Sequence, residues 1–145
     1  MLGFGVRAAR TFGCGLLLAS VLSAAGPAAA VTEDNFKLRT GIDIVELCSV
    51  GVDDPLFVAA IHMCHGFGVS SYQTLVAISS HEKIGAFFCP PEPAVTRNQA
   101  VADFLVWAKQ PENATHLNDS PAAVVGRFLL TKYPCPKPEA TGGGR

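Results

Sequence analysis

Four cysteines carry the clearest chemistry in this sequence: Cys48, Cys64, Cys89 and Cys135. They follow an N-terminal export signal, described below, and compartments outside the cytoplasm are oxidising. An even number of cysteines in such a domain predicts paired thiols, so we expect two disulfide bonds. A sulfur atom held in a bridge cannot attack a substrate, and this set therefore argues against a cysteine-dependent enzyme.

His62, Cys64 and His65 place three potential metal ligands within four residues. In a helix the two histidines share roughly one face, but Cys64 points elsewhere. The sequence has no second CxxC or HxxxH pair to complete a tetrahedral site, and covalent haem requires CxxCH where only Cys64-His65 is present. We predict no metal ion and no cofactor, and interpret the segment as a disulfide cysteine between two partly exposed histidines.

The sequence contains only fragments of catalytic motifs. His81-Glu82 begins like the zinc-binding HExxH motif, but Gly85 stands where the second histidine is required. No GxSxG turn is present, and no glycine-rich phosphate loop precedes a helix. A Cys–His nucleophile built on Cys64 competes with disulfide formation, which the even cysteine set favours. The sequence therefore predicts that this protein is not an enzyme.

The first 30 residues predict a cleaved secretory signal peptide. A positive region, an apolar stretch and a small-residue cleavage site follow one another: Arg7 and Arg10, Phe12–Ala25, and Ala28–Ala30. The apolar stretch is shorter than the ~20 residues of a spanning helix, and Gly26-Pro27 interrupts it, so we expect no membrane anchor after cleavage. Most of the apolar stretch follows Cys14 instead of preceding it, so lipidation is not expected. We predict that the mature protein is periplasmic.

Removing residues 1–30 from the 145-residue chain leaves 115 residues, which suits one domain. Nine Lys and Arg then face twelve Asp and Glu, a net charge of −3. A weakly acidic domain without basic runs lacks the electrostatic footprint of a nucleic-acid-binding protein. We predict a helical domain over residues 31–135 and a disordered tail over residues 136–145, which contain Gly142–Gly144.

The mature sequence predicts an all-α fold, a small bundle of about four to five helices stapled by two disulfides. Each expected helix has a start signal: Thr40 with Asp43 for the first, Asp54-Pro55 for the second, the capping box Thr96–Gln99 for the third and Pro121 for the fourth. A proline-rich loop is expected from about Ser79 to Val95. Pro111 ends the third helix, and Tyr133-Pro134 closes the fourth.

Apolar residues at three- and four-residue steps predict the buried faces. In chain order these are Ile44, Val45, Leu47 and Cys48; Phe57, Ile61, Cys64, Gly68, Ser71 and Leu75; Val101, Phe104, Leu105 and Ala108, with Trp107; and Ala122, Val125, Leu129 and Leu130. Ala59, Ala60, Gly66 and Gly68 are small enough to let another helix approach closely. Each of the two glycines should weaken its helix by ~1 kcal/mol relative to alanine.

Four cysteines allow three pairings, and the helix order ranks them. Cys89 lies just before the third helix and Cys135 just after the fourth, so an antiparallel pair of helices brings them to the same end. That leaves Cys48 to pair with Cys64, which requires the Ser49–Asp53 connection to fold back. Loop-closure entropy assigns ~3 kcal/mol to the shorter loop and ~4 kcal/mol to the longer one.

The order of several short motifs resembles one family over nearly the whole mature chain, from about Phe36 to Cys135. The motifs are Thr40-Gly41, Leu47-Cys48, Met63–Phe67, Phe88–Pro91, Val95-Thr96 with Gln99, Pro111-Glu112, Pro121–Ala123 and Tyr133–Cys135. The chain resembles the periplasmic immunity proteins that neutralise amidase effectors of type VI secretion systems. The resemblance implies an all-helical, usually dimeric protein that binds a peptidoglycan-cleaving amidase and blocks its catalytic cleft without catalysis of its own.

The resemblance also implies where the partner binds. In such complexes a protruding loop between late helices enters the cleft, and the matching region is Gln110–Ser120. Its polar residues are the candidate contacts: Glu112, Asn113, His116, Asn118 and Asp119. The sequence departs from the family's pattern in the greater length of this connection, in Asn98 where glycine is common, and in Phe67 where tyrosine is usual. The identity of an effector therefore does not follow from the resemblance.

Three other interpretations remain open from the sequence. The Gln110–Ser120 region also fits an ordinary solvated loop, since surface loops vary freely. Four histidines allow an acid-stress chaperone that exposes apolar surface when they become charged: His62, His65, His81 and His116. An uncharacterised hydrolase would require at least one free catalytic cysteine.

Overall fold

The computed structural model describes residues 30–81 and 85–136, and in this part of the chain every regular element is helical. In chain order the elements are η1 (Glu33–Lys37), α1 (Gly41–Cys48), α2 (Phe57–His81), α3 (Arg97–Ala108), η2 (Pro111–Asn118) and α4 (Pro121–Lys132), where η marks a 3-10 helix. The predicted all-α fold is confirmed. Apart from residues 30 and 136, the predicted signal peptide and C-terminal tail lie outside the described residues, as does Glu82.

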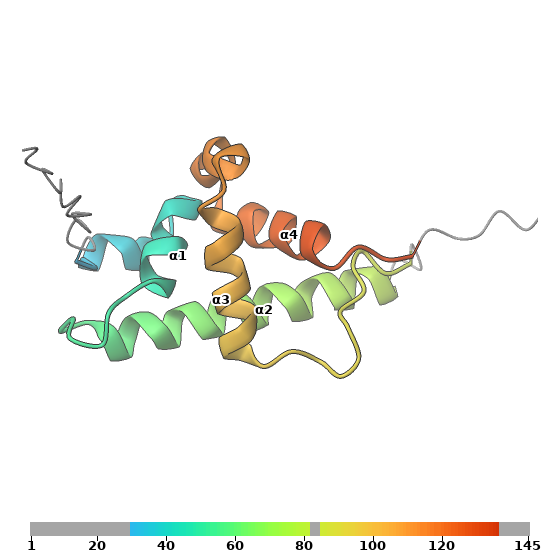
Figure 1. Cartoon of the computed structure of the whole chain (residues 1–145), viewed down its shortest axis with the longest axis horizontal. Helices are drawn as coiled ribbons and strands as arrows, with labels where there is room; N and C mark the ends of the chain where they lie inside the picture. The colour runs from blue at the N-terminus through green and yellow to red at the C-terminus, as the bar shows by residue number, and fades with distance from the viewer. Residues whose placement is uncertain (1–29, 82–84, 137–145) are drawn as a thin grey trace, which may run out of the picture.

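The long helix α2 lies along one side of the molecule, and the other helices pack on it (Figure 1). The α1 helix contacts its N-terminal half, α3 crosses it steeply, and α4 runs beside its C-terminal half. The connection between α3 and α4 contains η2, which stands at the end of the molecule farthest from α2. No described helix is both long and apolar enough to cross a membrane.

Two of the predicted helix starts depend on the expected residues. The Asp43 carboxylate accepts hydrogen bonds from the backbone N–H groups of Arg39 (2.8 Å) and Thr40 (3.0 Å), which satisfies donors before α1. The Ser120 hydroxyl accepts from the Ala123 N–H at 3.4 Å. Pro121 follows at the first position of α4, as predicted, where a proline loses no hydrogen bond.

At the start of α3, one of the two predicted hydrogen bonds of the capping box is present. The Thr96 hydroxyl accepts from the Gln99 N–H at 3.2 Å, so the N-cap is confirmed. The reciprocal half of the predicted capping box is wrong, because the Gln99 amide donates instead to the Asp103 carboxylate at 3.0 Å, one turn further along the helix. Asp103 also pairs with Lys132 of α4 at 3.2 Å. The ion pair with Lys132 thereby joins α3 to α4, whereas the contact with Gln99 lies within α3.

Asp54 caps the turn that leads into α2, and the regular helix begins later, at Phe57. One carboxylate oxygen of Asp54 accepts from the Leu56 N–H at 2.7 Å. The other accepts from the Val31 N–H at 3.1 Å, and Val31 is buried. Asp54 thus fixes the entry to α2 and holds the segment at Val31 against it.

Most of the apolar residues predicted to be buried lie in the core, but the buried face of α4 differs from the predicted one. Ile44, Leu47, Phe104, Trp107 and Ala108 are buried. In α4 the predicted Val125 and Leu129 are buried, whereas Ala122 and Leu130 are exposed and were wrongly predicted. Sequence analysis missed Val124 and Phe128. The Phe128 ring lies against three other aromatic rings: Phe104 at 5.4 Å, Trp107 at 6.0 Å and Tyr133 at 6.1 Å between centroids.

The small residues of α2 do not all allow close helix packing. Ala60 is fully buried, in agreement with the prediction. A β-carbon added at Gly66 or Gly68, however, would meet no atom within 4 Å, so the predicted close approach at these two positions is wrong. The two glycines instead border space that the other helices leave unfilled.

Both predicted disulfide pairings are confirmed. Cys48 at the end of α1 is joined to Cys64 of α2, with 5.1 Å between their α-carbons. Cys89 is joined to Cys135, with 4.7 Å between α-carbons, and the Cys89 N–H also donates to the Tyr133 carbonyl at 2.7 Å. The first bridge is buried in the core, whereas Cys89 is exposed.

We predict that the buried Cys48–Cys64 disulfide stabilises the fold more than Cys89–Cys135, although it closes the shorter loop. Replacing Cys48 and Cys64 by alanine should lower the free energy of unfolding by about 3–5 kcal/mol, because it removes a cross-link and leaves a cavity. Replacing Cys89 and Cys135 should cost about 2–4 kcal/mol, although that bridge closes the longer loop. Urea denaturation of the two double variants measures both values. A larger loss in the second variant would contradict the prediction.

Candidate partner-binding site

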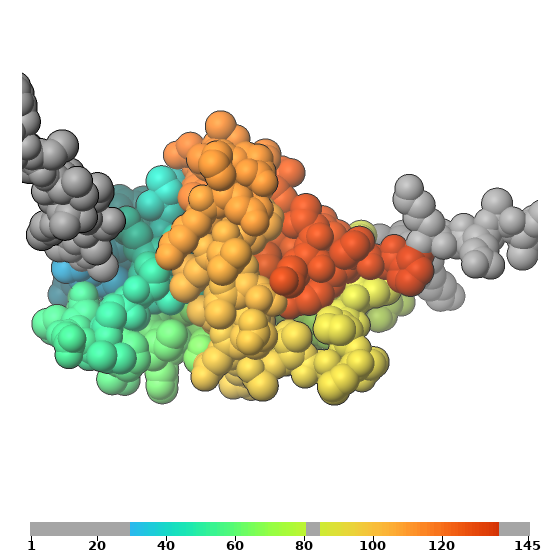
Figure 2. Space-filling model, viewed as in Figure 1, coloured from blue at the N-terminus to red at the C-terminus, as the bar shows by residue number. Residues whose placement is uncertain are grey.

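The region predicted to bind a partner is an ordered helix instead of an irregular loop. Residues Pro111–Asn118 form η2, with Pro111 at its first position. Figure 1 and Figure 2 show this segment, in orange, as a protrusion from the body of the molecule. We call Gln110–Ser120 the apex. The resemblance implied a protruding loop; the segment does protrude, but it contains a 3-10 helix and is anchored to the body at both of its ends.

Asn113 anchors the beginning of the apex. Its side chain is 8% exposed, and its amide group donates to the Trp107 carbonyl at 2.8 Å. That carbonyl belongs to the last turn of α3, where backbone acceptors have no partner within the helix. The Asn113 N–H also donates to the Gln110 carbonyl at 3.0 Å. The structure thus turns Asn113 inward, where it positions the apex and does not offer its side chain to a partner.

Gly41 anchors the end of the apex. The Gly41 N–H donates to the Asp119 carbonyl at 2.8 Å. A β-carbon at this position would collide with the Val124 side chain and would lie 3.0 Å from the Leu117 carbonyl oxygen. Only glycine therefore lets α1, η2 and α4 meet here. This role of Gly41 was not predicted from the sequence, although Gly41 belongs to one of the motifs that carried the resemblance.

The other four candidate contacts present polar groups at the surface of the apex. Glu112, Asn118 and Asp119 are exposed, and the His116 side chain is about one-third exposed. His116 Nδ1 lies 3.8 Å from an Asp119 carboxylate oxygen, and the Asn118 amide donates to the Thr115 carbonyl at 3.4 Å. Two carboxylates and neutral polar groups give this surface a negative charge near neutral pH.

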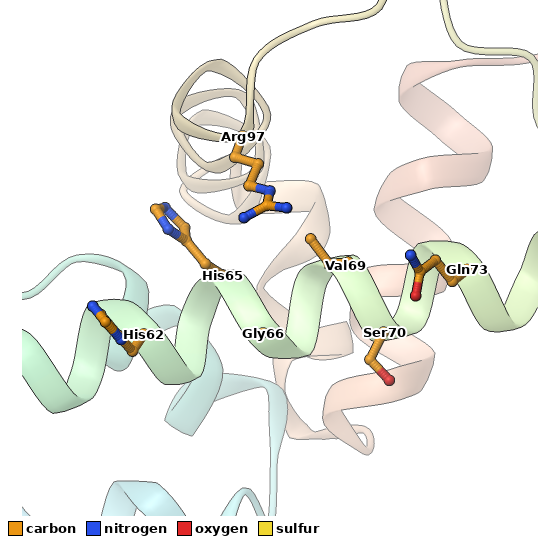
Figure 3. Close-up of a pocket in the computed structure, with 7 residues that line it drawn as sticks. All are labelled: His62, His65, Gly66, Val69, Ser70, Gln73 and Arg97. Atoms are coloured by element: carbon orange, nitrogen blue, oxygen red, sulfur yellow. The ribbon is translucent and has the colours of Figure 1, made fainter.

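His62 and His65 lie away from the apex, on α2. They line an open hollow together with Gly66, Val69, Ser70 and Gln73 of α2 and with Arg97 at the start of α3 (Figure 3). Cys64 between them is held in its disulfide. Within residues 30–81 and 85–136, no group of three or more His, Cys, Asp or Glu side chains is arranged to hold a metal ion.

The fold and the apex define a small disulfide-linked helical domain that holds out an ordered polar helix. The family model of the Rap1a immunity proteins matches residues 40–135, and the chain belongs to that family. The match extends from the N-cap of α1 to the last bridged cysteine, and it includes the whole apex. The predicted membership of a type VI secretion immunity family is confirmed. Nothing among curated proteins or solved structures matches the chain.

The anchoring role of Asn113 predicts a difference between two asparagines of the same element. Asn113→Ala should lower the free energy of unfolding by about 0.5–1.5 kcal/mol, because it removes a buried hydrogen bond, while the Trp107 carbonyl keeps its bond from the Gln110 N–H at 3.2 Å. The exposed Asn118 makes only one long hydrogen bond, so Asn118→Ala should change stability by less than about 0.5 kcal/mol. Thermal and urea unfolding of both variants test the difference. Equal losses would show that Asn113 is no anchor.

Proposed function

We propose that this protein is an exported immunity protein that binds an amidase effector of type VI secretion and covers its catalytic cleft with the apex. Membership of the immunity family gives the general role against type VI effectors. The observation that carries the finer proposal is the ordered, protruding polar helix η2, which lies in the region where the resemblance places the inhibitory element. The protein acts by binding and has no catalysis of its own.

The anchoring of the apex supports an inhibitory role in energetic terms. Ordering a flexible loop on binding costs about 0.5–1.5 kcal/mol for each side chain that is immobilised. Here the Asn113 amide and the Gly41–Asp119 hydrogen bond hold the backbone of the apex before any partner arrives. A partner would therefore bind a prepared surface and lose less affinity to ordering.

The charge of the apex indicates the kind of surface that it would meet. Glu112 and Asp119 are exposed acidic residues on either side of His116. A cleft lined by basic groups would attract them, and complementary charges raise association rates and select the correct partner. We therefore propose a cationic rim around the cleft of the effector.

The proposed function requires the protein to be exported to the periplasm. The predicted signal peptide would deliver the chain to the periplasm, where an amidase reaches peptidoglycan and where the two disulfides are stable. An immunity protein must meet the effector in the compartment in which the effector acts. The membership of the immunity family agrees with this location.

We also propose a homodimer that pairs through α2. The C-terminal half of α2 and the neighbouring α4 expose several large apolar side chains: Tyr72, Val76, Ile78 and Leu130 are each 39–45% exposed. Tyr72 and Val76, four residues apart, share one side of α2, whereas Ile78 faces another side, so the proposed contact uses the side that carries Tyr72 and Val76. The apex lies away from this half of α2 (Figure 1), so a dimer could still present one apex on each copy.

A charge reversal tests the apex without touching its anchors. The double variant Glu112→Lys, Asp119→Lys should keep the stability of the wild type and bind the amidase at least tenfold more weakly, because two carboxylates become cations. The matched control is Glu33→Lys, Asp53→Lys, which makes the same change in charge at exposed residues on another part of the surface.

The amidase for this measurement would first be captured from periplasmic extract by the mature oxidised protein and identified by mass spectrometry. Titration calorimetry then gives the affinities of both double variants. Wild-type affinity in the apex variant would show that another surface binds the effector. Capture of many unrelated proteins, and only at acid pH, would contradict the immunity proposal and favour the acid-stress chaperone.

The dimer proposal has its own test. Val76→Glu should shift the protein from dimer to monomer, because it places a carboxylate in an apolar contact. Val106→Glu is the matched control, since Val106 is 64% exposed on α3 and lies outside the proposed contact. Sedimentation velocity measures the oligomeric state of both variants. A wild-type monomer at all concentrations would refute the proposal.

A further inference from the structure

The two disulfide bonds differ in their exposure to solvent. Cys48 and Cys64 are 7% and 2% exposed, in the core between α1 and α2. Cys89 is exposed and Cys135 is half-buried, and both lie in irregular segments at the surface that a second protein can reach. Disulfide exchange begins when a thiolate attacks one of the two sulfur atoms, so access decides which bond reacts. The buried bond therefore reacts only after the core has opened locally, whereas the outer bond can react in the folded protein.

The surroundings of the outer bond favour attack at Cys89. The Ala86 carbonyl oxygen lies 3.6 Å from the Cys135 sulfur atom, and Cys135 is the less exposed of the two cysteines. This oxygen carries a partial negative charge, which repels an approaching thiolate. An incoming thiolate is therefore expected to bond to the Cys89 sulfur and to release Cys135.

The outer bond holds the segment between α2 and α3 against the end of α4. The Cys89 N–H donates to the Tyr133 carbonyl at 2.7 Å. The neighbouring Phe88 is 5% exposed, and its ring meets the Tyr72 ring of α2 edge-on at 5.2 Å between centroids. Without the bond, this part of the segment depends on these non-covalent contacts, and it should open locally far more often.

The apex has anchors of its own. The Asn113 amide donates to the Trp107 carbonyl, and the Gly41 N–H donates to the Asp119 carbonyl. The buried disulfide holds α1, the helix that carries Gly41. The irregular segments after α2 and after α4 lie together at one end of α2, away from the apex (Figure 1). Opening the outer bond should therefore release the segment after α2 and leave the apex in place.

We propose that Cys89–Cys135 is a site of reversible exchange with the CxxC dithiol of another protein, and that Cys48–Cys64 is not. One thiolate of the dithiol attacks the Cys89 sulfur, the Cys89–Cys135 bond breaks, and Cys135 leaves as a thiolate that takes up a proton. The second thiolate then attacks the mixed disulfide and displaces Cys89. The dithiol is oxidised by two electrons to its own disulfide, and both cysteines are reduced to thiols. This proposal does not depend on the immunity role.

Timed reduction of the mature oxidised protein tests the difference between the bonds. Dithiothreitol is added without denaturant, samples are quenched with iodoacetamide, and peptide mass spectrometry follows the labelling of each cysteine. Cys89 and Cys135 should be labelled about tenfold faster or more, because the buried pair reacts only in molecules that have opened. The matched control is the same reaction in concentrated guanidinium chloride, where the two pairs should react at similar rates.

Two further measurements test the partner and the structural consequence. A thioredoxin variant whose second CxxC cysteine is serine should be trapped as a mixed disulfide with Cys89. After selective reduction of the outer bond, hydrogen exchange at the Cys89 N–H should rise about tenfold or more. Exchange at the Asn113 N–H, which donates to the Gln110 carbonyl within the apex, should stay unchanged.

Each measurement has an outcome that would overturn the proposal. Equal labelling of all four cysteines without denaturant would show that the fold does not separate the two bonds. Failure to trap the thioredoxin variant, or trapping mainly at Cys135, would refute the assigned partner or the assigned point of attack. Unchanged exchange at the Cys89 N–H would show that the bond does not hold the segment, and faster exchange at the Asn113 N–H would show that it supports the apex.

Discussion

At Gly41 the backbone of α1 touches both η2 and α4, and the arrangement of the domain depends on this contact. A β-carbon there would overlap the Val124 side chain and would crowd the Leu117 carbonyl. The same residue donates its N–H to Asp119, while the buried Asp43 carboxylate caps the preceding turn and accepts from the Asn35 amide at 3.3 Å. The body of the protein therefore sets where the apex lies.

The two disulfides hold the segments around this contact in place. Cys48–Cys64 holds α1 on α2, and so fixes the helix that carries Gly41. Cys89–Cys135 joins the segment that follows α2 to the segment that follows α4. Closing a loop removes conformations from the unfolded chain, which favours the folded state. The protein thereby gains a rigid tip from a small core.

The same bundle is tightly packed at one place and loosely packed at another. Phe128 contacts Phe104, Trp107 and Tyr133, and Val124 is fully buried beside Gly41. Beside Gly68, in contrast, the helices stand apart and leave an open, mainly apolar cleft.

The sequence by itself determined the helical fold, the N-cap at Thr96, the start of α4 at Pro121 and both disulfide pairings, because these depend on local chemistry and on the order of elements along the chain. It could not fix the buried face of α4, since apolar residues surround most of that helix and periodicity alone does not select one side. The inward position of Asn113, the requirement for glycine at residue 41 and the cleft beside Gly68 were decided only by the tertiary structure. Each of them arises where residues distant in the sequence meet, and their packing depends on the final positions of whole helices.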